Sequence, residues 1–398
     1  MIGLQVTPTC ILELKRRVRI GWCCIPQCLK IRKLNIRINA KYAQRDANTV
    51  RWKIFAITVL GISALSGCIN QSGLNDNDWT IMIYMAGDNS LSDVVDGNLE
   101  EISNAGSSEG LKIVVLSDKA GEGDSHLYYV GKKQLIEQPI SSIWLKRPDE
   151  VYTGRHETLQ SFIDWGMGNY SSSHYMLIMW GHGAGWKGAA EDKGDVLNLT
   201  EMRLALGDRK LDIIAFDACY MGTVEIYHTL EQNAGYIIAS EKKMPRAGWP
   251  YEKILGHVKG HSPLEVGKMI VDRYVEAYEG GKKDSESLSI ELALLKTKTG
   301  LCSKVKEFLD GTPPVDFSSP MKFEDEDSAD LSSVIQDLNV TKELNRTVVK
   351  IGRWSNSNST FEVSNASGLA IYCPKKPMDE AYPETGFATY TGWDRFFR

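Results

Sequence analysis

The feature that most constrains the fold is a regular alternation of apolar runs with helical patterns. From Asp78 onward, the runs "WTIMIYMAG", "LKIVVLSD", "HYMLIMWGHG", "LDIIAFDACYMG" and "GYIIASE" are separated by stretches whose apolar residues recur at helical spacing. Strands that are apolar almost throughout are typical of a parallel sheet buried on both faces by helices. We therefore predict an α/β fold with a mostly parallel central sheet, and we expect its chemistry at the carboxyl ends of the strands.

The alternation continues beyond residue 255, with a helical pattern in "LEVGKMIVDRYVEAY" and strand patterns in "SLSIELALLK" and "GLAIYC". We interpret residues 78–255 as a core and residues 256–398 as an α/β extension of the same unit. Cys302 lies on an amphipathic helix pattern and Cys373 ends a strand pattern. Both are predicted to be core residues rather than reactive ones.

The N-terminal region has a different charge from the remainder of the chain. Basic residues far outnumber acidic ones before residue 54, although the whole chain carries a formal net charge of −5. The remainder is therefore strongly acidic, which argues against a nucleic-acid partner because the phosphate backbone repels it.

The segment Ile54–Leu65 is uncharged, follows Arg51 and Lys53, and leads into "LSGC" ending at Cys68. It is too short to span a bilayer and is typical of a bacterial lipoprotein signal peptide. A buried core helix with a chance cysteine is the alternative.

A signal peptide in this position leaves residues 1–49 without a role. Our hypothesis is that Val50 is the true first residue, decoded from an alternative start codon, and that residues 1–49 are not part of the product. Residues 50–67 would then be the signal peptide, Cys68 the lipidated residue and residues 68–77 a polar tether. We expect an exported protein that a lipid on Cys68 holds to a membrane, at the cell surface or in the periplasm.

Two apolar runs end in side chains that can do chemistry. One ends in "WGHGAGW", where His182 lies between Gly181 and Gly183, and the other ends in Asp217 and Cys219. Glycines beside a histidine let a substrate backbone approach and free an amide to point at it. If the two strands are neighbours, the thiol and the imidazole face one cleft. The alternatives are a structural role for the cysteine and a helix N-cap role for Asp217.

The "HG" after one apolar strand and the "DACYMG" after the next resemble the clostripain family of cysteine peptidases, in the group that contains caspases, legumain and gingipains. The resemblance covers about residues 78–398 and includes "WTIMIYMAGDNSL" and "GWPY". It implies a caspase-like α/β/α sandwich in which Cys219 is the nucleophile and His182 its proton partner. It also implies an oxyanion hole from the backbone amides of Gly183 and Cys219. Asp217 would form the floor of the S1 pocket and select Arg or Lys, because a buried carboxylate needs a cationic partner.

The chain also departs from the family pattern. After Glu241 the family tends to carry further acids, whereas this chain has three basic residues, Lys242, Lys243 and Arg246. The strictness of the basic preference is therefore open. Asp88 and Asn89 match the family's "DN" after the first strand, and they either cap the next helix or line the cleft.

Relatives of this family often cleave themselves in the loop after the catalytic histidine. In this chain that loop contains Lys187 and Lys193, and we predict self-cleavage after Lys193, with Lys187 as the second candidate. Some relatives depend on calcium, but we find no calcium-ligand loop in the sequence. We therefore predict no metal site and no other cofactor from the residues, and a calcium requirement, which the resemblance allows, stays open.

The leading hypothesis is a lipid-anchored cysteine endopeptidase, expected to be a monomer, that acts on protein or peptide substrates with a basic P1 residue. The alternative is a catalytically silent surface lipoprotein that uses the same fold to bind peptide or polysaccharide. The presence of both His182 and Cys219 in their motifs argues against it. A thiol oxidoreductase is disfavoured because Cys219 has no second cysteine in C-x-x-C spacing.

Overall fold

The computed structural model describes residues 76–143, 150–279, 283, 288–313, 320–323, 327–357, 359, 362–375 and 377–397. The predicted signal peptide, the cysteine predicted to carry a lipid, Cys68, and residues 1–49, which are predicted to be absent from the product, lie outside the described residues. What the sequence predicts for them stays a prediction. Within the described ranges, no helix combines the length and the apolar character that crossing a lipid bilayer requires.

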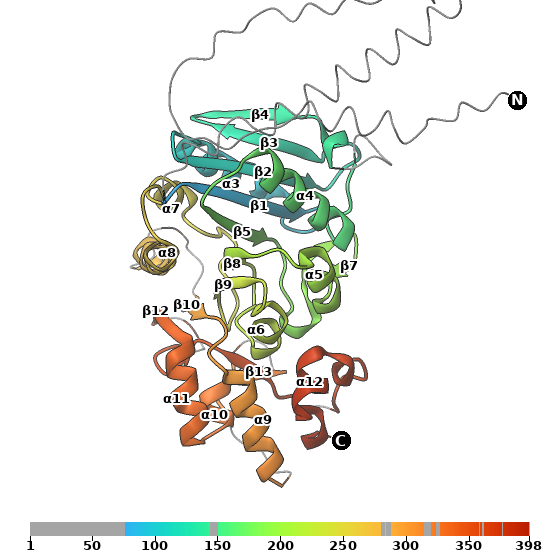
Figure 1. Ribbon diagram of the computed structural model, residues 1–398, viewed down its shortest axis with the longest axis vertical. Helices are drawn as coiled ribbons and strands as arrows, with labels where there is room; N and C mark the ends of the chain where they lie inside the picture. The colour runs from blue at the N-terminus through green and yellow to red at the C-terminus, as the bar shows by residue number, and fades with distance from the viewer. Residues whose placement is uncertain are drawn as a thin grey trace, which may run out of the picture. The chain divides into compact units, whose positions relative to one another are not determined.

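The apolar runs of the sequence form a nine-stranded sheet (Figure 1). Its strands are β1 (Trp79–Gly87), β2 (Leu111–Lys119), β3 (His126–Gly131), β4 (Gln134–Gln138), β5 (His174–Trp180), β8 (Leu211–Asp217), β9 (Ala234–Ala239), β10 (Ile290–Lys296) and β12 (Val348–Trp354). Their spatial order is β12-β10-β9-β8-β5-β1-β2-β3-β4. The strands from β9 to β2 pair in parallel, whereas the edge strands β3, β4, β10 and β12 pair antiparallel.

Helices cover both faces of this sheet (Figure 1). One layer contains α3 (Ser92–Ala105), α7 (Tyr251–Leu255) and α8 (Pro263–Tyr278); the other contains α4 (His156–Asn169), α5 (Leu199–Leu206), α6 (Val224–Leu230), α9 (Leu301–Gly311), α11 (Leu338–Thr347) and α12 (Gly386–Thr391). Alternate side chains of a strand point to opposite layers. In β1, Tyr84 packs in the layer of α4, whereas Ile83 and Met85 pack in the layer of α3. The predicted α/β/α sandwich is confirmed.

Two short strand pairs lie outside the main sheet. Strand β6 (Ala189–Asp192) pairs with β7 (Asp195–Leu197), and β11 (Ser328–Asp330), which leads into α10 (Leu331–Val334), pairs with β13 (Ala370–Tyr372). The sequence predicts only a loop where β6 and β7 form a hairpin. The hairpin forms because the chain makes a tight turn at Lys193 and Gly194, whose φ values are +50° and +85°. Two positive φ values in succession give the tight turn that suits the twist of a hairpin.

Residues after 255 contribute to the same sheet and core as the residues before them. Strand β10 pairs with β9, and β12 pairs with β10. On the layer of α6, the carboxylate of Glu225 accepts hydrogen bonds from the backbone N–H of Tyr372, at 3.0 Å, and from the hydroxyl of Tyr382, at 2.7 Å. These contacts hold the C-terminal segment against the helix that follows the Cys219 loop.

Candidate active site

The ends of β5 and β8 bring the predicted catalytic residues to the same place. The two strands are parallel neighbours, and Trp180 pairs with Asp217 in their register. His182 and Cys219 each follow two residues later. Both therefore extend from the carboxyl edge of the sheet, where neighbouring parallel strands present their side chains to a shared crevice.

A cavity of about 270 Å³ opens at this edge. It is lined by Ser90, Leu91, Trp180, Gly181, His182, Asp217, Ala218, Cys219, Lys243, Met244, Pro245, Arg246 and Gly248. The cavity thus contains the predicted nucleophile, its proton partner and the predicted specificity residue. A volume of this order holds one long side chain of a substrate rather than a large ligand.

Cys219 differs from the other described cysteines in exposure. Cys302 and Cys373 are buried and, as the sequence predicts, belong to the core, whereas Cys219 is partly exposed; none of the three is in a disulfide. Burial raises the pKa of both the Cys302 and the Cys373 thiols, which keeps them protonated and inert. The Cys219 sulfur accepts a hydrogen bond from the backbone N–H of Met244 at 3.3 Å. The same sulfur lies 3.9 Å from the carbonyl oxygen of Met244, to which the thiol donates.

The imidazole of His182 has a partner of its own. Its Nε2 atom lies 2.8 Å from the hydroxyl oxygen of Ser90, which follows β1. Its backbone oxygen accepts from the N–H of Ala190, at the start of the β6–β7 hairpin. His182 is thus tied to the neighbouring strand β1 on one side and to the hairpin on the other.

Gly183 and Cys219 are in backbone contact. A Cβ atom on Gly183 would overlap the carbonyl oxygen of Cys219 and would lie 3.0 Å from its nitrogen. Glycine is therefore required here for steric reasons rather than for its φ angle. The contact places the backbones of the two residues predicted to form the oxyanion hole side by side.

The loop after Cys219 is held by the strand next to it. The N–H of Tyr220 donates to the carbonyl of Lys242 at 3.0 Å, and the N–H of Gly222 donates to the carbonyl of Ser240 at 2.7 Å. Tyr220 has a φ of +61°, a conformation that costs an ordinary residue about 1 kcal/mol. Residues strained in this way cluster at functional sites, where the surrounding contacts hold them.

Asp217 lines the cavity and is 5% exposed. Its Oδ2 atom accepts hydrogen bonds from the N–H of Trp249 and the hydroxyl of Tyr251, both at 2.9 Å. Burial raises the pKa of Asp217 to about 6, although these two hydrogen bonds oppose the shift. Helix α6 begins at Val224, with Thr223 as its N-cap, so Asp217 is not the cap of that helix.

The three basic residues that depart from the family pattern have different positions. Lys242 is fully buried, and its ammonium donates to the carbonyl of Ser289. Lys243 and Arg246 line the cavity. The guanidinium of Arg246 donates to the carbonyl of Ser90 at 2.8 Å and pairs with Asp93 on α3. One of the three cations therefore points into the core, and two remain at the cavity.

The two lysines predicted for self-cleavage lie on the segment that follows His182. Lys187 is exposed and pairs with Asp379 at 3.1 Å, but the residues directly after it, 188–190, are buried. Lys193 is at the tip of the β6–β7 hairpin, where residues 193–195 are all exposed. Its ammonium pairs with Asp88 at 2.7 Å and with Glu150 at 2.9 Å.

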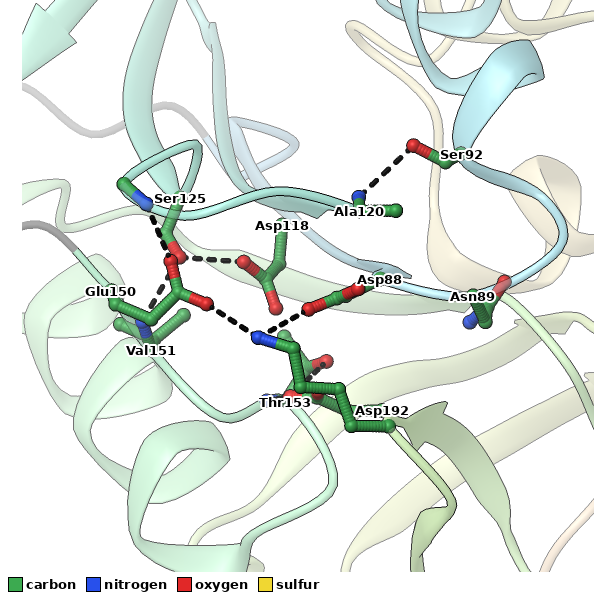
Figure 2. Close-up of polar contacts among 12 residues, drawn as sticks. Asp88, Asn89, Ser92, Asp118, Ala120, Ser125, Glu150, Val151, Thr153 and Asp192 are labelled. Atoms are coloured by element: carbon green, nitrogen blue, oxygen red, sulfur yellow. Dashed lines mark hydrogen bonds and ion pairs between the residues drawn. The ribbon is translucent and has the colours of Figure 1, made fainter.

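The structure also brings together a cluster of five acids that the sequence did not predict. Asp88, Asp118, Asp124, Glu150 and Asp192 come from separate positions along the chain and meet at the carboxyl edge of β1 and β2. Figure 2 shows the carboxylates of Asp88, Asp118 and Glu150 turned toward one region. Burial, together with the neighbouring carboxylates, raises the pKa of Asp118 to about 8. No contiguous motif could have revealed this cluster; the only signal was the family-like Asp88.

Comparisons with known proteins agree with this fold. Residues 83–366 match the model of the clostripain family. The chain therefore belongs to the clostripain family of cysteine peptidases. It is 29% identical to clostripain of Hathewaya histolytica over an alignment that covers 48% of this chain and 44% of that protein. The chain thus spans less than half the length of this relative.

Two solved structures share the fold. A secreted C11 cysteine protease from Bacteroides thetaiotaomicron, bound to an irreversible peptide inhibitor, superposes with a TM-score of 0.66 at 19% identity, covering 80% of this chain and 99% of that chain. An inactive zymogen C11 protease from Parabacteroides distasonis superposes with a TM-score of 0.65 at 19% identity, covering 79% and 98% of the two chains. At this identity the likeness supports the fold alone.

Proposed function

We propose that this chain is a cysteine endopeptidase in which Cys219 and His182 form the catalytic dyad. The observation that carries the proposal is the cavity at the ends of β5 and β8, which both residues line; the backbone of Gly183 is in contact with that of Cys219. His182 takes the thiol proton, and the thiolate attacks the scissile carbonyl carbon. The amides of Gly183 and Cys219 stabilise the resulting oxyanion. The imidazolium then protonates the departing amine, and water hydrolyses the thioester.

The proposed substrates are proteins or peptides with Arg or Lys at P1. The support is Asp217, a nearly buried carboxylate that lines the cavity and whose ionised form is disfavoured by burial. A substrate cation compensates that desolvation. Lys243 and Arg246 line the same cavity and repel a basic side chain that is not fully inserted. We infer that they reduce affinity for basic residues at the neighbouring substrate positions and leave P1 to Asp217.

The proposed processing site is Lys193. The hairpin tip is exposed on both sides of the Lys193–Gly194 bond, whereas the residues after Lys187 are buried. Cleavage needs an extended segment, so the Lys193 ammonium must first leave Asp88 and Glu150. Processing after Lys193 is therefore expected to be slower than cleavage of an unstructured peptide.

The proposed location is outside the cytoplasm, with a lipid on Cys68. This rests on the sequence pattern around residues 51–68, since that segment lies outside the described residues. Fractionation of a bacterial host that expresses the full chain tests it. Wild type is expected in the membrane fraction and Cys68→Ser is not; equal membrane association of both would contradict the anchor.

The peptidase proposal is tested with fluorogenic peptides that end in Arg, Lys, Asp or Asn. Wild type is expected to cleave after Arg and Lys, and Cys219→Ala and His182→Ala are expected to be inactive. Cys302→Ala is the matched control, because it removes a buried thiol from the core and is expected to keep activity. Turnover that survives in Cys219→Ala would refute the mechanism. No turnover by wild type on any peptide would favour the silent binding lipoprotein instead.

A further inference from the structure

Residues 240–244 follow β9 and hold the segment 219–222, which carries the proposed nucleophile. Their backbone supplies two carbonyls that accept from N–H groups of that segment and one N–H that reaches the Cys219 sulfur. The two segments are in close contact, because a Cβ atom on Gly222 would lie 2.8 Å from the nitrogen of Glu241. The position of Cys219 therefore depends on the contacts that fix residues 240–244.

Glu241 fixes this loop from the side opposite to the Cys219 segment. It is 1% exposed. Its N–H donates to Oε2 of Glu291 on β10 at 2.9 Å, and its Oε1 atom accepts from the N–H of Gly368, just before β13. The N–H of Ala370 on β13 donates in turn to the carbonyl of Gly222 at 2.8 Å. Glu241 thus ties its loop to a strand that also holds the Cys219 segment.

Three carboxyl groups meet in this buried region, those of Glu241, Glu291 and Asp330, and the last two are fully buried. Asp330 uses both oxygens as acceptors, Oδ1 for the N–H of Ser333 at 2.9 Å and Oδ2 for the N–H of Ser367 at 2.6 Å. The Oε2 atom of Glu241 is buried and has no donor among the described residues. Its nearest carboxyl partner is Asp330. An ionised Glu241 would therefore face another acceptor.

The surrounding charges favour a proton on Glu241. Burial, followed by the charges of Asp330 and Glu291, raises the pKa of Glu241 well above its ordinary range. Burial also raises the pKa of Glu291 to about 7, although the nearby cations Lys242 and Arg353 oppose the shift. A proton on Oε2 of Glu241 removes the unpartnered charge and makes this atom a donor to Asp330.

We propose that Glu241 is a neutral carboxylic acid that positions the segment carrying Cys219. Its carbonyl oxygen accepts from Gly368, its hydroxyl donates to Asp330, and its loop supplies the backbone contacts to residues 219–222. Glu241 is not among the residues that line the cavity, so it is a positioning residue rather than a catalytic one. Its effect on turnover rests on the proposed peptidase function.

Positioning is tested by hydrogen–deuterium exchange in the Cys219→Ala chain, so the result does not depend on the peptidase proposal. In Glu241→Ala, the amides of residues 219–222 are expected to exchange about tenfold faster, because the loop loses its buried hydrogen bonds. Glu241→Gln is expected to exchange like its parent, since an amide offers the same donor and acceptor as a protonated carboxyl group. Unchanged exchange in Glu241→Ala would overturn the positioning role. Fast exchange in Glu241→Gln as well would overturn the neutral acid.

The matched control is Glu343→Ala, which removes a buried acid that pairs with Arg346 on α11. It is expected to leave the exchange of residues 219–222 unchanged. Exchange of helix α4 is measured in the same samples, and equal acceleration there in Glu241→Ala would overturn a specific role. Circular dichroism checks folding. Glu241→Met, which fills the space but cannot form the hydrogen bonds, replaces Glu241→Ala if the alanine variant does not fold.

The link to catalysis is tested in the active chain with an Arg peptide. Glu241→Ala is expected to lower kcat about ten- to hundredfold with little change in KM, because a misplaced nucleophile weakens the transition state rather than substrate binding. Glu241→Gln is expected to restore kcat. Equal losses in both variants, or a change confined to KM, would overturn this link. An inactive wild type would refute the peptidase proposal, whereas the exchange experiment would still decide the positioning role.

Discussion

The Asp217→Asn substitution is expected to stabilise the protein while removing its main activity. The carboxylate lines the cavity, and burial raises its pKa to about 6 from an ordinary value of 3.8. An asparagine oxygen can still accept the hydrogen bonds from Trp249 and Tyr251. The substitution therefore removes a disfavoured charge and keeps the local hydrogen bonds.

The sign and size of the stability change follow from proton linkage. Because the folded pKa is raised, the native state binds more protons than the unfolded chain between pH 3.8 and about 6, and stability falls as pH rises through that window. The rise in the pKa of Asp217 from 3.8 to about 6 lowers the free energy of unfolding by about 3 kcal/mol at pH 7.5 and by about 1.6 kcal/mol at pH 5. Asparagine does not ionise, so the variant is expected to exceed its parent in free energy of unfolding by up to these amounts.

The loss of activity comes from the same carboxylate. Removing the buried anionic partner of a basic P1 side chain costs at least about 3 kcal/mol of transition-state stabilisation, which is roughly a hundredfold in kcat/KM. Asp217→Asn is expected to lose this much on Arg and Lys peptides. Activity on Arg peptides that stays at the wild-type level would refute the S1 role.

Stability is measured by urea unfolding at pH 5 and pH 7.5 in the Cys219→Ala background, followed by tryptophan fluorescence. Asp212→Asn, on the same strand, is the control. Its carboxylate accepts hydrogen bonds from His174 and from the N–H of Tyr175, so its replacement is expected to gain no stability. If Asp217→Asn is less stable than its parent at pH 7.5, or if its advantage does not shrink at pH 5, the argument from burial is wrong.

Two further substitutions test the oxyanion hole and the C-terminal segment. Gly183→Ala is expected to reduce kcat/KM about 10²–10³-fold, which is the effect of losing one oxyanion donor. The reason is that the added Cβ would overlap the carbonyl oxygen of Cys219. Gly97→Ala, on an open helix surface, is the control in the same peptide assay. Full activity in Gly183→Ala would contradict the backbone contact. Glu225→Ala is expected to lower the free energy of unfolding by about 2–4 kcal/mol, since two buried donors at the C-terminal segment lose their acceptor. A loss below the error of a urea titration would show that this segment is held by other contacts.

The parts predicted from sequence are those that depend on neighbours along the chain. The apolar strand runs predicted a sheet buried on both faces, and its parallel centre is confirmed. His182 and Cys219 were predicted to share a cleft because parallel strands bring their carboxyl ends to one edge, and the two residues line one cavity. The hairpin after His182 was missed because its strands are short and its turn depends on the φ angles of Lys193 and Gly194.

Burial and charge compensation were decided by the tertiary structure. The sequence could not separate Lys242, which is buried against Ser289, from Arg246, which reaches the cavity. Nor could it predict the acid cluster, whose members meet only because β1, β2 and the β6–β7 hairpin converge. The alternation of apolar and polar residues is set by local backbone geometry and can be read from the chain. The desolvation of a charge depends on every group packed around it, and those groups come from distant parts of the sequence.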